Sequence, residues 1–318
     1  MKKFLTVLAT IPFLTACGPS NTIISGGGAT FPSTLYNRWF NDYNQETGEK
    51  VNYQATGSGT GVRQFNAETI DFGASDESIP DSKIKAPVIQ IPMTGGAIAV
   101  AFNNPGCAEL WLTQEQLAGV FMGRYTNFNQ IGCNSQPITV VHRSDGSGTT
   151  AGFTASLSSF DTEWKKKIGH GKSVQWPVGI GAKGNAGVAA VIKQNSGTIG
   201  YVNVGYTLND QLKVASIQNS DGFYMEPYTT AAKTALNEIK LDDKLRGSNP
   251  NPEGKESYPI VSLTWILARP EHPNNESMKK LFRYMLSVPA QLKAGELGYV
   301  PLPDSIRFPA LEAVESLK

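Results

Sequence analysis

The sequence is poor in the side chains that metal and thiol chemistry require. It has 318 residues but only three cysteines and three histidines. The histidines are scattered, and no cysteine has a second one two to four residues away, so no zinc-binding pattern is present. We therefore expect no metal site.

Charge of either sign is not in excess. Lys and Arg together number 28 and Asp and Glu number 27, which gives a formal net charge of +1. The longest basic run is Lys165–Lys167. Proteins that bind nucleic acid usually carry a basic face or stripe, so we expect no nucleic-acid partner.

Motifs of covalent or nucleotide-dependent catalysis are also missing. No GxSxG elbow and no Walker A loop occurs. Gly179–Gly184 matches GxGxxG, but it follows Trp176-Pro177, and the acidic residue that the dinucleotide motif places about twenty positions further on is missing. We interpret this segment as a turn, and we expect neither a cofactor nor enzymatic activity.

Long hydrophobic runs are absent as well. The apolar run Phe4–Leu14 follows two lysines and has about a dozen residues, whereas a membrane-spanning helix needs about 20. It leads into Leu14-Thr15-Ala16-Cys17, which fits a secretory signal with a lipobox. We predict that residues 1–16 are a signal peptide and that diacylated Cys17 anchors the protein to a membrane, in the periplasm or at the cell surface. The alternative is a plain signal peptide or a short buried helix, with Cys17 incidental.

Export would place the other two cysteines, Cys107 and Cys133, in an oxidising compartment. An even number of cysteines in such a compartment favours a disulfide. We predict a bond between them, and two buried free thiols are the alternative.

The residues that are abundant indicate a turn-rich globular protein. Gly numbers 32 and Pro 19, while charged residues make up only 17%. The length favours two domains. A strand-like run, a loop of Gly, Ser and Thr, and an amphipathic helix follow one another three times, in 22–43, 51–66 and 138–157. This alternation predicts an α/β fold with mostly parallel sheets, in which ligands bind at the carboxyl ends of strands.

Each of the three loops ends where we expect a helix to begin. Unpaired backbone N–H groups and the partial positive charge of a helix N-terminus favour an anion there. One such loop alone is more often a plain turn, but three together predict an anion site. The loops add hydroxyl donors and a planar guanidinium: Thr30, Ser58, Ser147, Thr149 and Arg143.

Two carboxylates, Asp76 and Asp145, interrupt this set of donors. Asp145 either pairs with Arg143 and holds its planar fork, or caps the helix that follows. Asp76 could accept a hydrogen bond from a protonated oxyanion, such as phosphate near neutral pH, whereas sulfate has no proton to offer. The alternative for Asp76 is an exposed turn residue.

At these residues the chain resembles the phosphate-binding proteins of the bacterial Pst phosphate transporter. The resemblance covers most of the chain after Cys17 and is weakest from Leu208 to Glu256 and at the C-terminal end. It is carried by six segments: GGGATFP, VNYQATGSGTG, DFGASD, RSDGSGT, WPVGIGAKGNAGVAA and GTIGYV.

The resemblance implies a two-lobed clamshell in which each lobe is a mostly parallel sheet flanked by helices. Residues 22–97 together with 258–318 would form lobe 1, and residues 98–257 would form lobe 2. Asp145 would orient Arg143. Carried over residue by residue, the implied phosphate contacts are Thr30, Phe31, Ser58, Asp76, Arg143, Ser147, Gly148 and Thr149.

The resemblance also implies a function, namely tight binding of inorganic phosphate between the lobes and its delivery to an ABC importer. We expect a monomer whose partners are phosphate, the membrane permease of that importer, and the membrane itself through Cys17. Two alternatives stay open. One is an extracellular phosphatase, for which the sequence offers no nucleophile–base pair or metal cluster. The other is a binder of another oxyanion, such as sulfate or molybdate.

Overall fold

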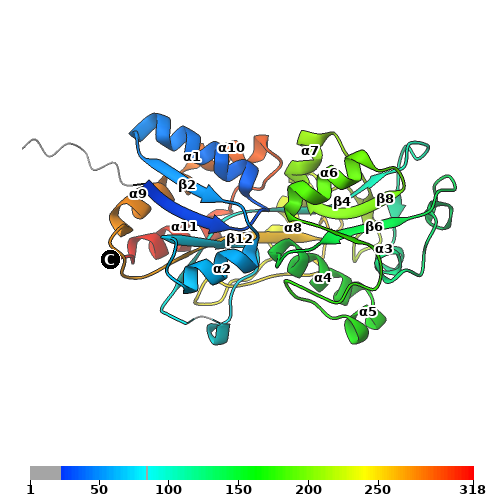
Figure 1. Ribbon diagram of the computed structural model, residues 1–318, viewed down its shortest axis with the longest axis horizontal. Helices are drawn as coiled ribbons and strands as arrows, with labels where there is room; N and C mark the ends of the chain where they lie inside the picture. Colours follow the sequence, from blue (N-terminus) through cyan, green and yellow to red (C-terminus); the bar gives the residue numbers. More distant parts are fainter. Residues whose placement is uncertain (1–22, 84) are drawn as a thin grey trace, which may run out of the picture.

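The computed structural model describes residues 23–83 and 85–318 (Figure 1). The predicted signal peptide and Cys17 lie outside the described residues. Within the described ranges, no helix combines the length and the apolar character needed to cross a membrane.

One large mixed sheet runs through the molecule. Its strands have the order β2-β1-β3-β12-β4-β8-β6-β7, with β9 paired to β4, and a small second sheet has the order β11-β10-β5. The strands are β1 (Ile23–Gly28), β2 (Lys50–Gln54), β3 (Phe72–Ser75), β4 (Ile89–Asn103), β5 (Trp111–Leu112), β6 (Thr139–Arg143), β7 (Ile180–Ala182), β8 (Thr198–Asn203), β9 (Lys213–Val214), β10 (Ser216–Gln218), β11 (Tyr224–Met225) and β12 (Val261–Ala268).

The helices gather into two groups around this sheet. In Figure 1, α1, α2, α9, α10 and α11 from the two ends of the chain flank one half, and α3 to α7 from its middle flank the other. The molecule therefore has two lobes. The helices are α1 (Ser33–Thr47), α2 (Ser58–Asn66), α3 (Gln114–Met122), α4 (Gly148–Phe160), α5 (Thr162–Lys167), α6 (Gly184–Gln194), α7 (Val204–Asp210), α8 (Thr229–Leu236), α9 (Asn275–Met285), α10 (Val288–Glu296) and α11 (Asp304–Glu315).

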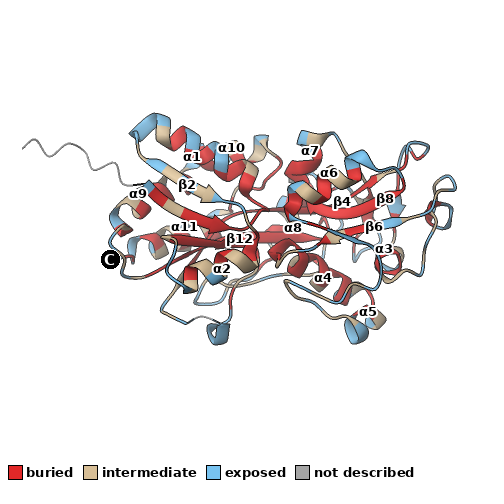
Figure 2. Ribbon diagram, viewed as in Figure 1, coloured by how far each residue is buried: buried red, intermediate tan, exposed pale blue. Residues whose placement is uncertain are grey.

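Strand β4 joins the two halves of the sheet. Its residues Ile89–Ala97 pair with β12, whereas Ile98–Asn103 pair with β8. Strand β12 continues the first half by pairing with β3. Both strands are buried almost throughout, as Figure 2 shows in red. A strand covered on both faces has a nearly continuous apolar sequence, which explains the run Ala97–Phe102.

Parallel pairs form the outer part of each half of the large sheet, whereas the two strands in its middle, β4 and β12, pair antiparallel. Strand β1 is parallel to β2 and β3, and β6 is parallel to β7 and β8. Strands β4 and β12 are antiparallel to all their neighbours among the described strands. The strand–loop–helix repeats are local, so they predict the parallel parts and carry no information on the joining strands.

Two segments differ from the sequence prediction. Gly26–Gly28 belong to β1 rather than to the glycine-rich loop of the first repeat. The interpretation of Gly179–Gly184 as a turn was wrong, because the segment contains β7 and begins α6. Three of its residues extend along β6, with Ala182 opposite Arg143, and so complete the edge of the sheet.

Helix α1 supplies the core of the first lobe. Leu35, Trp39 and Tyr43 recur every four residues along its buried face. The helix begins after Pro32 and ends at Gly48, whose φ of 76° forms a left-handed cap. The buried face therefore fixes where the preceding turn meets the sheet.

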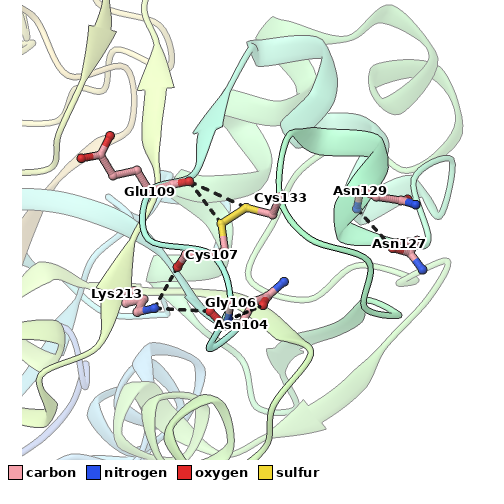
Figure 3. Close-up of a disulfide and its surroundings, with 8 residues drawn as sticks. All are labelled: Asn104, Gly106, Cys107, Glu109, Asn127, Asn129, Cys133 and Lys213. Atoms are coloured by element: carbon pink, nitrogen blue, oxygen red, sulfur yellow. Dashed lines mark hydrogen bonds between the residues drawn. A yellow bond between two sulfur atoms is a disulfide. The ribbon is translucent and has the colours of Figure 1, made fainter.

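A disulfide joins Cys107 to Cys133 in the second lobe, across a sequence separation of 26 (Figure 3). The Nζ of Lys213 donates to the backbone oxygens of Asn104 (3.3 Å) and Cys107 (2.8 Å) and so ties the same loop to β9. A cross-link that closes a loop of this size stabilises a fold by about 3 kcal/mol. The bond therefore closes a loop that contains β5 and α3.

Candidate functional site

The N-termini of α1, α2 and α4 converge between the two lobes. The backbone N–H of Gly59 in α2 donates to the oxygen of Gly146, which precedes α4, at 2.8 Å. The N–H of Asp76, at the end of β3, donates to Ser58 Oγ in the first turn of α2 at 3.3 Å. The loops predicted from sequence therefore meet at one place.

The side chains predicted to bind an anion are withdrawn from solvent there. Asp145 is half-buried. Gly148 is also buried. The remaining residues are at most 6% exposed: Thr30, Phe31, Ser58, Asp76, Arg143, Ser147 and Thr149.

Several hydrogen-bond donors at this place have no acceptor in the part of the chain that the structure describes. Among the described residues, the backbone N–H groups of Thr30, Phe31, Gly148 and Thr149 make no hydrogen bond. The Oγ of Ser147 caps α4 by accepting the N–H of Thr150 at 3.0 Å, which leaves the hydroxyl hydrogen free to donate. Buried donors without partners are costly, so the site suits a ligand rich in acceptor oxygens.

Arg143 ends β6 and is held by Asp145. Its Nε and Nη2 donate to the two carboxylate oxygens at 2.8 and 2.5 Å. Burial alone raises the pKa of Asp145, but the bonds and charge of Arg143, with the N–H of Gly184 at 2.9 Å, lower it below its usual value. Asp145 is therefore the partner of Arg143, and the cap of α4 is Ser147 instead.

The remaining nitrogen of this guanidinium, Nη1, is buried and has no hydrogen-bond partner among the described residues. Nε and Nη2 are both committed to Asp145, so the fork cannot turn to satisfy Nη1 without losing a charge-assisted bond. A fixed, unpaired cationic donor is therefore available to an anion.

Asp76 is buried rather than an exposed turn residue. Its Oδ1 accepts from Thr264 Oγ1 at 2.9 Å, and its Oδ2 accepts from Thr149 Oγ1 at 3.4 Å. Burial raises the pKa of Asp76 to about 7, although Thr264 and the charge of Arg143 act in the opposite direction. The carboxyl is therefore poised to give or take a proton near neutral pH.

Close backbone contact between the lobes depends on Gly148. A Cβ at this position would lie 2.7 Å from the backbone nitrogen of Asp76 and 2.7 Å from its Cβ. No side chain fits in that space. The glycine therefore lets the first turn of α4 reach the end of β3.

Further contacts cross between the lobes around the site. Tyr206 in α7 donates from its hydroxyl to the backbone oxygen of Thr30 at 2.7 Å. The Nζ of Lys172 lies 3.1 Å from a carboxylate oxygen of Glu77. Beside Asp76, a cavity of about 460 Å³ lies between α4 and residues 247–250. The lobes are thus in contact around the buried donors, with one hollow next to Asp76.

Several residues of this site were not predicted from the sequence. Thr264 on β12 holds Asp76, Tyr206 holds the first loop, and Asn185 donates to both Thr30 and Thr149. No local sequence pattern indicated that Thr264 or Tyr206 would belong to the site. Asn185 lies in a segment that carried the family resemblance, directly after the residues that had been interpreted as a turn.

No group of three or more metal-ligating side chains gathers within residues 23–83 and 85–318. The polar groups of the site are mostly donors, whereas a metal ion needs acceptor ligands. These polar groups therefore suit an anion better than a metal ion.

Comparison with known proteins defines the class first. Residues 15–288 match the PBP superfamily domain, so the chain belongs to that superfamily. In a solved structure, the putative phosphate ABC transporter substrate-binding protein with bound phosphate from Clostridium perfringens has a TM-score of 0.69 at 18% identity. The match covers 89% of this chain and 100% of that one. The two-lobed α/β fold predicted from the sequence is thereby confirmed.

Within this class, similarity extends to one family over nearly the whole chain. The phosphate-binding protein PstS of Haemophilus influenzae is 36% identical over 325 residues, which cover 96% of each protein. PstS of Xylella fastidiosa is 38% identical over 305 residues, which cover 89% of this chain and 82% of that protein. The chain belongs to the family of PstS phosphate-binding proteins, as its sequence motifs predicted.

The raised pKa of Asp76 predicts how stability depends on pH. Because this pKa lies above that of the unfolded chain, the folded protein binds the extra proton between about pH 4 and pH 7. The contribution of Asp76 to the free energy of unfolding therefore falls as pH rises through this range, by up to about 4 kcal/mol. Asp76→Asn should remove this slope and make the ligand-free protein more stable than wild type at pH 8.

Urea denaturation in phosphate-free buffer at pH 5, 6.5 and 8 measures this effect. The difference in unfolding free energy between the variant and the wild type should grow with pH. A constant difference across the three pH values would contradict a raised pKa for Asp76.

Proposed function

We propose that this chain binds inorganic phosphate between its two lobes and delivers it to the membrane permease of an ABC importer. One observation supports the proposal: the buried Nη1 of Arg143 and the buried carboxyl of Asp76 lie at the place where the N–H groups of Thr30, Phe31, Gly148 and Thr149 have no acceptor among residues 23–83 and 85–318. We call these donors, with Nη1, the donor ring. The donors suit the unprotonated oxygens of phosphate, and Asp76 suits its one protonated oxygen.

In the proposed complex, phosphate accepts hydrogen bonds from all of these donors and gives one to Asp76. Arg143 Nη1, the backbone N–H groups of the first and third loops, and the threonine and serine hydroxyls donate to the anion. Asp76 accepts from the P–OH group. Sulfate has no proton near neutral pH, so when Asp76 is ionised its carboxylate would face a sulfate oxygen with no hydrogen between them. The complete proposed set is Thr30, Phe31, Ser58, Asp76, Arg143, Ser147, Gly148 and Thr149, with Asp145 orienting Arg143.

Lobe boundaries follow from the course of the chain. We assign residues 22–97 with 258–318 to lobe 1 and residues 98–257 to lobe 2. The change of partner in β4 between Ala97 and Ile98 supports the first crossing, and β12, which pairs with β3, supports the return to lobe 1. Each lobe supplies part of the donor ring, so bound phosphate would hold the lobes together, and binding would be a hinge closure.

Calorimetry on the purified protein tests the choice of anion. The wild type should bind one phosphate per chain and show no measurable heat with sulfate. The Asp76 carboxylate would be left unpaired and would repel sulfate, which lowers the affinity several-fold to thousand-fold. Asp76→Asn should bind sulfate measurably, because an amide can rotate to donate. Equal affinity of the wild type for both anions would rule out the specificity argument, and a variant that still excludes sulfate would show that Asp76 is not the discriminator.

We propose that the chain is a binding protein and not an enzyme. Ser147, the serine of the third loop, has its oxygen engaged in capping α4, and no histidine is among its hydrogen-bond partners in the described residues. A chromogenic phosphate monoester should therefore be stable in its presence. Release of product at a rate that Ser147→Ala abolishes would overturn this assignment.

We further propose that the protein acts as a monomer outside the cytoplasmic membrane and is anchored by lipid on Cys17. Support comes from the lipobox Leu14-Thr15-Ala16-Cys17 and the two lysines before the apolar run. A diacylated cysteine gives stable anchoring, because two acyl chains are enough.

Expression of the full chain in a bacterial host tests the anchor. The wild type should fractionate with membranes and run as a monomer once extracted, whereas Cys17→Ser should appear in the soluble extracytoplasmic fraction or keep its leader. A Cys17→Ser protein that fractionates with membranes at the wild-type mature mass would contradict the anchor. Cys107→Ser serves as the control for loss of an unrelated cysteine and should stay with the membranes.

A further inference from the structure

Asn185 directly follows the segment that had been interpreted as a turn, and it is not among the predicted ligand contacts. It is the second residue of α6, and its side chain is fully buried. Its Nδ2 lies 2.8 Å from Thr30 Oγ1 and 3.2 Å from Thr149 Oγ1. Asn185 therefore contacts two of the hydroxyls that surround the proposed anion.

The amide of Asn185 has one favoured orientation. Its Oδ1 accepts the backbone N–H of Asn203, at the end of β8, at 2.9 Å. Reversing the amide would turn NH₂ toward that N–H and leave two donors facing each other. Both hydrogens of Nδ2 are consequently directed at the two threonine oxygens.

This orientation limits what the Thr30 hydroxyl can do. Thr30 Oγ1 accepts the side-chain Nδ2 of Asn185 and also its backbone N–H, the latter at 3.2 Å. A hydroxyl has two acceptor sites and one hydrogen. Thr30 can therefore only donate, and within the described residues its hydrogen has no acceptor.

Thr149 is constrained in a similar way. Its Oγ1 accepts from Asn185 and lies 3.4 Å from Asp76 Oδ2, to which it donates. The hydrogen of Thr149 is thus directed toward the acidic side of the site. A threonine without such a neighbour could rotate and present a lone pair, which an anion repels.

We propose that Asn185 is a positioning residue that makes the hydroxyl of Thr30 act as a donor toward the bound anion, while it keeps the Thr149 hydroxyl directed at Asp76. The proposal rests on the proposed phosphate site and assigns Asn185 a part in its preference for acceptor-rich ligands. The bond from Asn185 to Thr30 also crosses between the lobes, so the Thr30 hydroxyl is fully aligned only when the lobes are in contact.

A pair of substitutions separates this role from packing. Asn185→Asp keeps the shape but replaces NH₂ with an acceptor, so the Thr30 hydroxyl would donate to it rather than to phosphate. Phosphate affinity at pH 8 should fall more than about 100-fold for Asn185→Asp and about 10-fold for Asn185→Ala, in which the hydroxyls rotate freely. A packing role predicts the reverse order, because Asp preserves the side-chain volume while Ala leaves a cavity.

A double-mutant cycle avoids the negative charge that Asn185→Asp introduces. Asn185→Ala should weaken phosphate binding in the wild type but have little effect in a Thr30→Val background, where the hydroxyl that Asn185 aligns is absent. An equal loss in both backgrounds would overturn the proposal. The cycle also decides the question if Asn185→Asp does not fold.

Two controls complete the experiment, which uses isothermal calorimetry with inorganic phosphate. Asn195→Asp changes an exposed asparagine at the other end of α6, whose Nδ2 donates to Val191 O at 2.8 Å, and should leave affinity within about twofold. Urea denaturation confirms that each variant is folded. A wild type that does not bind phosphate would reject the proposed function itself, whereas wild-type binding with no loss in Asn185→Ala and Asn185→Asp would reject only the role of Asn185.

Discussion

The rest of the structure depends on the buried guanidinium of Arg143, which keeps one N–H donor group, Nη1, without a partner among the described residues. Asp145 neutralises Arg143 and fixes two of its nitrogens, yet Nη1 stays buried without a partner among the described residues. An unsatisfied buried donor costs about 1–3 kcal/mol, and more when it is charged. The fold tolerates that cost because the joined sheet and its buried strands β4 and β12 stabilise the whole, and an anion that fills the site removes it.

The donors around Arg143 are divided between the lobes, and this division links binding to closure. Thr30, Ser58 and Asp76 follow β1, β2 and β3, whereas Arg143 and Thr149 follow or flank β6. Neither group alone surrounds an anion. The connection through β4 and β12 is made of extended, hydrogen-bonded strands, so the lobes stay in register while their facing loops approach. A ligand that satisfies both groups at once would therefore favour the closed arrangement over an open one.

Much of the fold and of the candidate site could be predicted from the sequence because the sequence patterns are local. A glycine-rich loop before an amphipathic helix predicts a helix N-terminus wherever it occurs, and the three loops of this kind do lead into α1, α2 and α4. The pairing of Arg143 with Asp145 was one of two alternatives, and it was visible because the two residues are close in sequence. Thr264, Tyr206 and Asn185 could not be predicted, since each acts through a contact with a residue at least 36 positions away. The short strand β7 was hidden by glycines that suit a turn equally well.

Discrimination between anions requires an acceptor directed at the ligand, and Asp76 provides one while its carboxyl is ionised. Backbone N–H groups and a guanidinium attract any oxyanion, and a free hydroxyl adapts to either partner. Thr264 occupies Oδ1 of Asp76, so Oδ2 is the oxygen left to face a ligand, and only Thr149 approaches it among the described residues. If Asp76 is ionised and Thr149 turns its hydrogen to the anion, Oδ2 can be satisfied only by a proton on the ligand. The Asp76 carboxylate then distinguishes a protonated anion from an unprotonated one, while the donors around it supply the affinity.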